Sequence, residues 1–235
     1  MVHIQPPADP GAFDLVVAMA HDDLAGPNVL RIDTALHGIR SSALAKAATV
    51  NDLRFAGLPR PWTGVLLGGS TRRTPFTVKD AHRLAADLDT LRASGGGSLL
   101  ITPSRRTPAA VVEVLRARYE ADPAVFLWAG HQPNPYLPIL ALADQLVVTS
   151  DSISMISEAL ATEARVWIFN VAGGPRHARF VENLLAKGLV APLGAAPPLE
   201  RRGGVDSTPH IAAVLRDLVE AKIGRTVARS DPGVL

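Results

Sequence analysis

The sequence predicts an α/β protein built around a doubly wound, parallel β-sheet. From about residue 63 onward, short apolar runs of the length of buried strands alternate with helical patterns. Glycine, proline and hydroxyl-bearing residues follow several of these runs, where a parallel strand would turn into a helix. Hydrophobic residues make up 47% of the 235 residues, which is enough for a substantial core. These observations favour one complete Rossmann-like domain.

The first quarter of the chain is less regular. Residues 1–12 contain three prolines and a glycine, so we expect them to be poorly ordered. A buried strand is predicted at 13–19, and 34–57 show only weak helical periodicity. Prolines at 59 and 61 are typical of a linker. We therefore expect residues 1–60 to be the remnant of an N-terminal Rossmann-like domain with a linker, and 61–235 to be the complete nucleotide-binding domain with a C-terminal helix.

The complete domain shows a repeated strand-to-helix pattern. The expected strands lie at 65–67, 99–102, 125–128, 146–148 and 166–169, with a short sixth at 189–191. The expected helices lie at 78–92, 111–119, 134–143, 155–160, 178–187 and 209–221. With the common strand order 3-2-1-4-5-6, the first and fourth of these strands are neighbours at the switch point of the sheet.

Two polar turns would face each other across that switch point. Gly68, Gly69 and Ser70 follow the first strand, and 150–154, with Ser150, Asp151, Ser152 and Ser154, follow the fourth. Glycine permits close approach of a ligand, and the amides of a helix N-terminus favour anions. A phosphate or diphosphate is the ligand that this arrangement predicts. Arg105 and Arg106, after the second strand, would add positive charge at the same edge.

Each of these residues also has a simpler interpretation. The glycine pair could form a tight turn with no ligand, and the serines could cap a helix. Glu158 could be a solvated helix residue or an acceptor for ligand hydroxyl groups. His21, with Asp22 beside it, is a candidate general base, with a purely structural histidine as the alternative.

Composition narrows the classes of function. The formal net charge is only +2, which gives no support to nucleic-acid binding. Without cysteine there is no disulfide or thiolate metal site, and no other cluster has metal-ligand spacing. The Walker A and G-x-G-x-x-G patterns are absent. No apolar run of about 18 residues and no signal sequence are present, so a cytoplasmic protein is expected, with peripheral membrane contact left open.

Four segments resemble a known family. They are HDDLAGPNV (21–29), LLGGS (66–70), TPSRRTP (102–108) and the block from Asn134 to Thr162. Together these resemble the bacterial branch of the mitochondrial fission Elm-type family, whose members are often labelled nucleoside-diphosphate-sugar epimerases. That family is similar in architecture to GT-B glycosyltransferases and usually has a fuller N-terminal domain than this chain.

The resemblance implies a GT-B-like protein with a nucleotide-sugar crevice between two Rossmann-like halves. It assigns ribose binding to Glu158 and diphosphate contact to Ser152 and Ser154, with Asn134 among the nucleotide contacts. It implies an inverting, metal-independent glycosyl transfer without a cofactor, in which His21 and Asp22 act as the base. A membrane-surface or lipid-linked acceptor is one option, and the oligomeric state is left open.

Two other functions remain alternatives. The first is a non-catalytic interaction protein, since plant relatives are understood to recruit a dynamin-like fission protein. The second is a nucleotide-sugar 2-epimerase, which would turn over its substrate without an acceptor.

Overall fold

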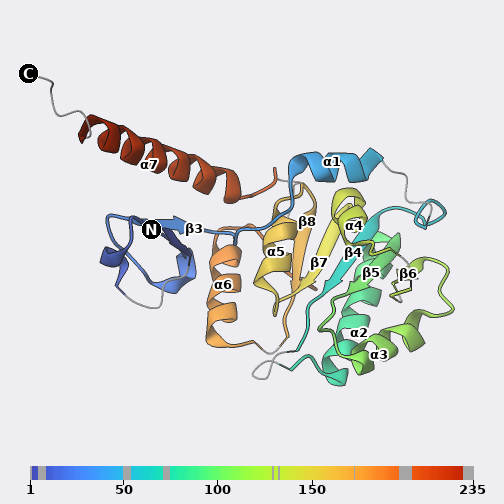
Figure 1. Cartoon of the computed structure of the whole chain (residues 1–235). Coiled ribbons are helices and arrows are strands. Elements are labelled where there is room, and N and C mark those ends of the chain that lie inside the picture. The colour runs from blue at the N-terminus through green and yellow to red at the C-terminus, as the bar shows by residue number, and fades with distance from the viewer. Residues whose placement is uncertain are drawn as a thin grey trace, which may run out of the picture. The chain divides into compact units, whose positions relative to one another are not determined.

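The chain folds into two compact units, each with its own parallel sheet. The computed structural model describes residues 2–4, 9–49, 54–70, 75–128, 130–131, 133–171, 173–195 and 203–229 (Figure 1). Unit 1 comprises Met1–Leu36 and Asp206–Leu235, and unit 2 comprises His37–Val205. The sheet of unit 1 has three strands and that of unit 2 has six.

The sheet of unit 2 confirms the predicted class and strand order. All its strands pair in parallel, in the order β6-β5-β4-β7-β8-β9. Their bounds are β4 Trp62–Leu67, β5 Ser98–Pro103, β6 Val125–Leu127, β7 Gln145–Thr149, β8 Arg165–Phe169 and β9 Ala191–Pro192. The order reverses between β4 and β7, so the expected switch point is present.

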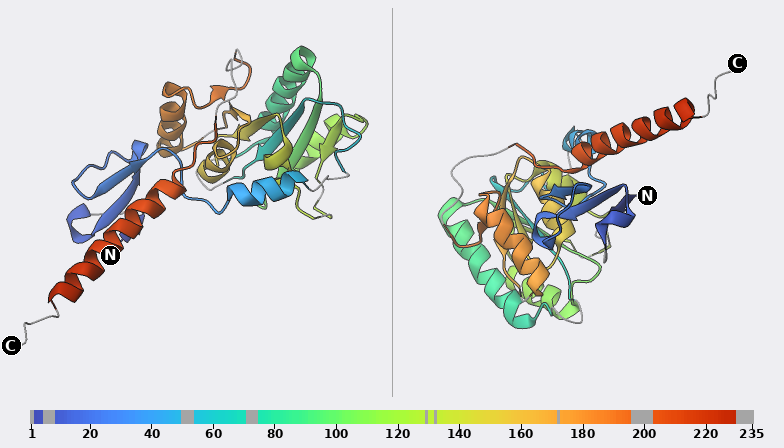
Figure 2. Two further views of the ribbon diagram at one scale, coloured as in Figure 1. Left: turned by 90° about the horizontal axis from the view of Figure 1, so that it is seen from above. Right: turned by 90° about the vertical axis from the view of Figure 1, so that its left-hand side faces the viewer.

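Helices cover both faces of this sheet. One face packs against α2 (Val78–Gly95) and α3 (Ala109–Tyr119), with Val65, Leu67 and Val147 in the shared core. The other face carries α4 (Tyr136–Leu142), α5 (Ile153–Leu160) and α6 (Pro175–Ala186). Helix α1 (Ser41–Thr49) packs against α4, and the left view of Figure 2 shows it on the opposite side of the sheet from α2. The helices predicted from periodicity in unit 2 are thus present, while the broad pattern at 34–57 yields only α1.

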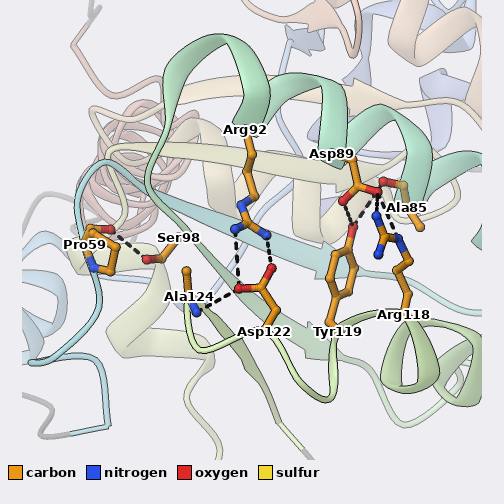
Figure 3. A network of polar contacts seen from close by, with 9 residues as sticks. All are labelled: Pro59, Ala85, Asp89, Arg92, Ser98, Arg118, Tyr119, Asp122 and Ala124. Carbon is orange, nitrogen blue, oxygen red and sulfur yellow. Dashed lines mark hydrogen bonds and ion pairs between the residues drawn. The ribbon is translucent and has the colours of Figure 1, made fainter.

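Polar contacts on one face connect α2 to α3 and to the chain that follows α3 (Figure 3). Tyr119 donates to the carbonyl oxygen of Ala85 at 3.1 Å and to Asp89 at 3.0 Å. Arg118 pairs with the same aspartate at 2.7 Å, and Arg92 pairs with Asp122 at 2.7 Å. The Arg92 hydrogen bond is the main reason why the pKa of Asp122 lies below its ordinary value.

Unit 1 departs from the sequence-based expectation at its start. Residues 2–4 form β1 (Val2–Ile4), which pairs in parallel with β2 (Leu15–Met19), and Pro10–Ala12 form a 3₁₀ helix. The expectation of poor order at 1–12 is therefore wrong for these residues, because a neighbouring strand fixes a segment too short to show periodicity. A third strand, β3 (Val29–Ile32), was not predicted either, and only its last residue is buried.

The C-terminal helix belongs to unit 1. Helix α7 (Thr208–Arg229), the long red helix of Figure 2, follows Ser207, which forms hydrogen bonds with Thr34 at 2.8 and 3.1 Å. Farther along, Lys222 pairs with Asp14 at 2.6 Å and is the main cause that lowers the pKa of Asp14 to about 2. The division of the chain thus differs from the expected boundary between residues 60 and 61. None of the described helices is both long enough and apolar enough to cross a membrane.

Candidate functional site

The two polar turns expected at the switch point are in direct contact. Strands β4 and β7 lie side by side with Leu66 opposite Val148, so both end at the same edge of the sheet. The amide of Gly68 donates to the hydroxyl of Thr149 at 2.8 Å. The amide of Gly69 donates to Oδ2 of Asp151 at 2.5 Å. The amides of Gly68 and Gly69 are therefore already used within the chain.

Both glycines are required by this packing. A Cβ atom on Gly68 would lie 2.3 Å from Oδ2 of Asp151, and one on Gly69 would lie 2.3 Å from the carbonyl carbon of Arg106. Contacts this short do not occur without movement of the neighbouring chain. The tight-turn interpretation therefore has a structural basis, and ligand contact at these two residues stays a prediction.

Ser70 and the loop after β5 also make contacts within the chain. The Ser70 hydroxyl accepts a hydrogen bond from the amide of Phe76 at 2.8 Å. Ser104 donates to the carbonyl oxygen of Gly68 at 2.9 Å and so holds the loop that carries the two arginines. The side chains of Arg105 and Arg106 are exposed. Their positive charge is available at this edge, as expected.

Asp151 is the most unusual group in the site. The residue is 5% exposed, and its Oδ1 atom has no hydrogen-bond partner in the part of the chain that the structure describes. A buried carboxylate oxygen without a donor is costly, and few are found in native proteins. Its negative charge lies beside the N-terminus of α5, where it interacts favourably with the helix dipole. Such a carboxylate is a hydrogen-bond acceptor and offers no donor to a diphosphate, so a ligand contact of Asp151 itself stays a prediction.

The three serines have different roles. Ser150 donates to the carbonyl oxygen of Val171 at 3.1 Å and accepts from the amide of the same residue at 3.0 Å, which joins the ends of β7 and β8. Ser152 is the N-cap of α5 and accepts from the amide of Met155 at 3.4 Å. Ser154 is exposed in the first turn of the helix. The first two amides of the helix, at 153 and 154, have no acceptor inside it, so this terminus remains suited to an anion.

Glu158 lies in the second turn of α5 and is partly exposed. Its Oε2 atom accepts a hydrogen bond from the hydroxyl of Tyr136, the first residue of α4. Burial, followed by the charge and the hydrogen bond of Glu158, raises the pKa of Tyr136 well above its ordinary value. Asn134 accepts from the amide of Tyr136 at 2.9 Å, so its side chain helps to begin α4. The sequence predictions missed Tyr136, although it lies in the same Asn-Pro-Tyr segment as Asn134.

A small cavity adjoins Ser150. Its volume is about 350 Å³, and its lining includes Ser150, Asn170, His177 and Glu182, at the end of β8 and the start of α6. Of these residues, only Ser150 was predicted as a site residue. The signal that could have indicated them is the Gly173-Gly174-Pro175 segment, which precedes the helix directly.

A second cavity, of about 780 Å³, lies at the opposite edge, where β7 and β8 begin. Gln145 in its wall donates to Thr63 at 2.9 Å and accepts from the indole N–H of Trp167 at 3.1 Å. Asp144 pairs with Arg60 at 2.7 Å. Because these polar groups bond to one another, the polar edge at the carboxyl ends of the strands is the better candidate site.

The predicted base lies in unit 1. His21 is 5% exposed, and its Nε2 lies 3.6 Å from Oδ1 of Asp22. Asp22 also accepts from the amide of Met19 at 3.1 Å, which closes a 3₁₀ turn (Ala20–Asp22). A catalytic role for this pair stays a prediction. Among the described residues, no group of three or more His, Cys, Asp or Glu side chains could hold a metal ion.

Comparison with known proteins identifies relatives. Residues 1–219 match the family model described as mitochondrial fission ELM1. The chain is 37% identical over 161 residues to the mitochondrial fission protein ELM1 of Arabidopsis thaliana, covering 66% of this chain and 36% of that protein. It is 27% identical over 169 residues to an uncharacterized protein, RP120, of Rickettsia prowazekii, covering 70% of this chain and 47% of that protein. The chain therefore spans less than half of the length of either relative.

A solved structure of a UGT transferase from Siraitia grosvenorii in complex with UDP is also similar. The TM-score is 0.35 at 14% sequence identity, and the match covers 82% of this chain and 43% of that one. The family is decided by the sequence match, which extends over nearly the whole chain. This chain belongs to the mitochondrial fission ELM1 family.

Proposed function

We propose that unit 2 binds a nucleoside-diphosphate sugar at the carboxyl edge of its sheet, as part of a glycosyltransferase or of a relative that has lost transfer activity. The observation that carries the proposal is the arrangement of α5. Its N-terminus, capped by Ser152, suits a diphosphate, and Glu158 six residues later presents a carboxylate that suits ribose hydroxyl groups. Six residues of helix span about 9 Å, comparable to the separation of ribose hydroxyls and terminal phosphate in a nucleoside diphosphate.

The charges around α5 support a diphosphate on its outer side. Ser154 is exposed in the first turn of α5, and Arg105 and Arg106 are exposed on the loop after β5, at the same edge of the sheet. Amides and guanidinium groups at one edge would stabilise a diphosphate in the ground state and as a leaving group. GT-B-like transfer would have an acceptor oxygen attack the sugar carbon while its bond to the diphosphate breaks. His21, assisted by Asp22, is the proposed acceptor of the hydroxyl proton.

Calorimetry with UDP, GDP, ADP and CDP sugars tests the proposal. We expect at least one to bind the folded protein, and Glu158→Gln to weaken binding about 10- to 100-fold, the usual loss for a hydrogen bond to a charged group. Glu120→Gln is the matched control because Glu120 is exposed at the end of α3, at the opposite edge of the sheet. Absence of binding at millimolar ligand to folded protein would rule out the proposal.

A non-catalytic role in fission is the second candidate, and the name of the Arabidopsis relative favours it. The internally satisfied Gly68-Gly69 turn is also compatible with a fold whose crevice has lost part of its binding function. Replacing the native gene with the double variant Ser152→Ala, Glu158→Ala separates the two functions. Survival of the cellular function would favour recruitment, and its loss would favour nucleotide binding. Turnover of a nucleotide sugar without acceptor would indicate an epimerase instead.

A further inference from the structure

The hydrogen bond between Tyr136 and Glu158 connects the first residue of α4 to the second turn of α5. We propose that Tyr136 is a positioning residue, which holds one oxygen of the Glu158 carboxylate so that the other is directed to a ribose hydroxyl of the ligand. This inference rests on the proposed nucleotide binding. It assigns to Tyr136 the selectivity of the site for ribonucleotides over deoxyribonucleotides.

The backbone of Tyr136 is fixed from both sides. Asn134 accepts a hydrogen bond from its amide at 2.9 Å, and the amide of Ile139 donates to the carbonyl oxygen of Pro135 at 2.9 Å. Ile139 and Leu140 are almost fully buried and anchor α4 against the sheet. The phenol therefore projects from a rigid helix start rather than from a mobile loop.

Helix α5 is fixed as firmly. Ile156, Ala159 and Leu160 are fully buried, while Glu158 is partly exposed on the same helix. A glutamate side chain without a partner would sample several rotamers, and a ligand would have to order it. The bond from Tyr136 restricts the carboxylate before the ligand arrives.

The protonation state of the pair suits this role. Burial and the neighbouring carboxylate keep the pKa of Tyr136 well above its ordinary value, so the phenol remains a donor. Tyr136 contacts Oε2, and no other hydrogen-bond partner of Glu158 is found among the described residues. A carboxylate can accept several hydrogen bonds, so Oε1 retains its capacity for a ligand hydroxyl.

The chain offers a matched control, because it contains only two tyrosines. Tyr119 is buried where Tyr136 is half-buried, and it also donates to an acidic side chain, Asp89. It lies on α3, which covers the opposite face of the sheet (Figure 3). Tyr136→Phe and Tyr119→Phe therefore each remove a phenol hydroxyl that donates a hydrogen bond to an acidic side chain. Only the first bond involves the proposed ribose contact.

The experiment measures binding of UDP and 2′-deoxy-UDP by calorimetry, with the corresponding ADP, GDP and CDP pairs as further arms. For the pair that binds, we expect the wild type to prefer the ribonucleotide. Tyr136→Phe should weaken ribonucleotide binding about 3- to 10-fold and leave the deoxynucleotide nearly unchanged. Tyr119→Phe should change neither, and Tyr136→Phe should add little loss to Glu158→Gln.

Other outcomes separate the possible failures. If the wild type binds none of the nucleotides, the proposed function fails and this inference fails with it. If the ribonucleotide binds Tyr136→Phe equally well or more tightly, Tyr136 is neutral or an obstruction and only the inference is overturned. Equal losses for the ribo and deoxy forms would show that Tyr136 acts on the fold rather than on ribose recognition. Circular dichroism of each variant confirms that it is folded.

Discussion

Gly69→Ala tests whether the glycine turn after β4 serves packing or ligand approach. An added Cβ would lie 2.3 Å from the carbonyl carbon of Arg106, so the neighbouring backbone would have to move by about 1 Å to reach ordinary contact. That backbone is held by Ser104, whose hydroxyl donates to Gly68 and whose amide donates to Leu67 at 2.9 Å. The loop cannot move without breaking these bonds.

Overpacking of this kind costs about 2–3 kcal/mol in the free energy of unfolding. For a protein of this size the loss corresponds to roughly 5–10 °C in melting temperature. Gly95→Ala is the matched control, because Gly95 ends α2 and a Cβ there would meet nothing within 4 Å. We expect that change to stabilise unit 2 by about 0.5 kcal/mol, since alanine loses less backbone entropy on folding.

Urea denaturation followed by tryptophan fluorescence is a suitable assay. The three tryptophans, Trp62, Trp128 and Trp167, all belong to unit 2, so the signal reports on that unit alone. A Gly69→Ala protein as stable as the wild type would refute the packing argument. If that stable variant also lost nucleotide binding, ligand approach would be the reason for the glycine.

Two further predictions concern charged pairs. Asp122→Asn should reduce the free energy of unfolding by about 1 kcal/mol at pH 7, because the Asp122 pKa is lowered chiefly by Arg92. Because the pKa of Asp122 is lower in the folded than in the unfolded protein, where it is near 4, the carboxylate stabilises the fold above that pH, and this stabilisation is lost as the pH falls through the folded pKa. The difference in the free energy of unfolding between wild type and variant should therefore shrink below about pH 4. A difference that does not depend on pH would contradict the prediction. For Asp14, NMR titration should give a pKa of about 2 in the wild type and a higher value in Lys222→Gln, because Lys222 is the largest cause of the lowered pKa. An unchanged value would exclude the pairing with α7.

The sheet of unit 2 could be predicted because its strands are local and apolar. Leu66, Leu100, Val147 and Ile168 belong to continuous buried runs, and short connections of fixed handedness leave few orders for them. In contrast, β1 has three residues and is defined by its pairing with β2. The attachment of α7 depends on contacts such as Thr34 with Ser207, separated by 173 residues, which leave no local pattern.

The candidate site was predictable only in outline. Turn composition placed the glycine and hydroxyl residues at the carboxyl edge of the sheet, where the structure has them. It could not indicate that Asp151 would accept from Gly69, 82 residues away, or that Tyr136 would reach Glu158. Such side-chain pairings depend on the register of β4 with β7 and on the crossing of α4 and α5, which sequence composition does not encode.

These contacts also make the two walls of the site unequal. At the Gly68-Gly69 wall both amides are hydrogen bonded, one to Thr149 and one to the buried Asp151. At the α5 wall Ser152 accepts from the amide of Met155, and the two preceding first-turn amides have no acceptor within the helix. A diphosphate is therefore expected against the first turn of α5 rather than in the glycine turn. The ribose would then lie toward Glu158, because the helix fixes the direction from one group to the other.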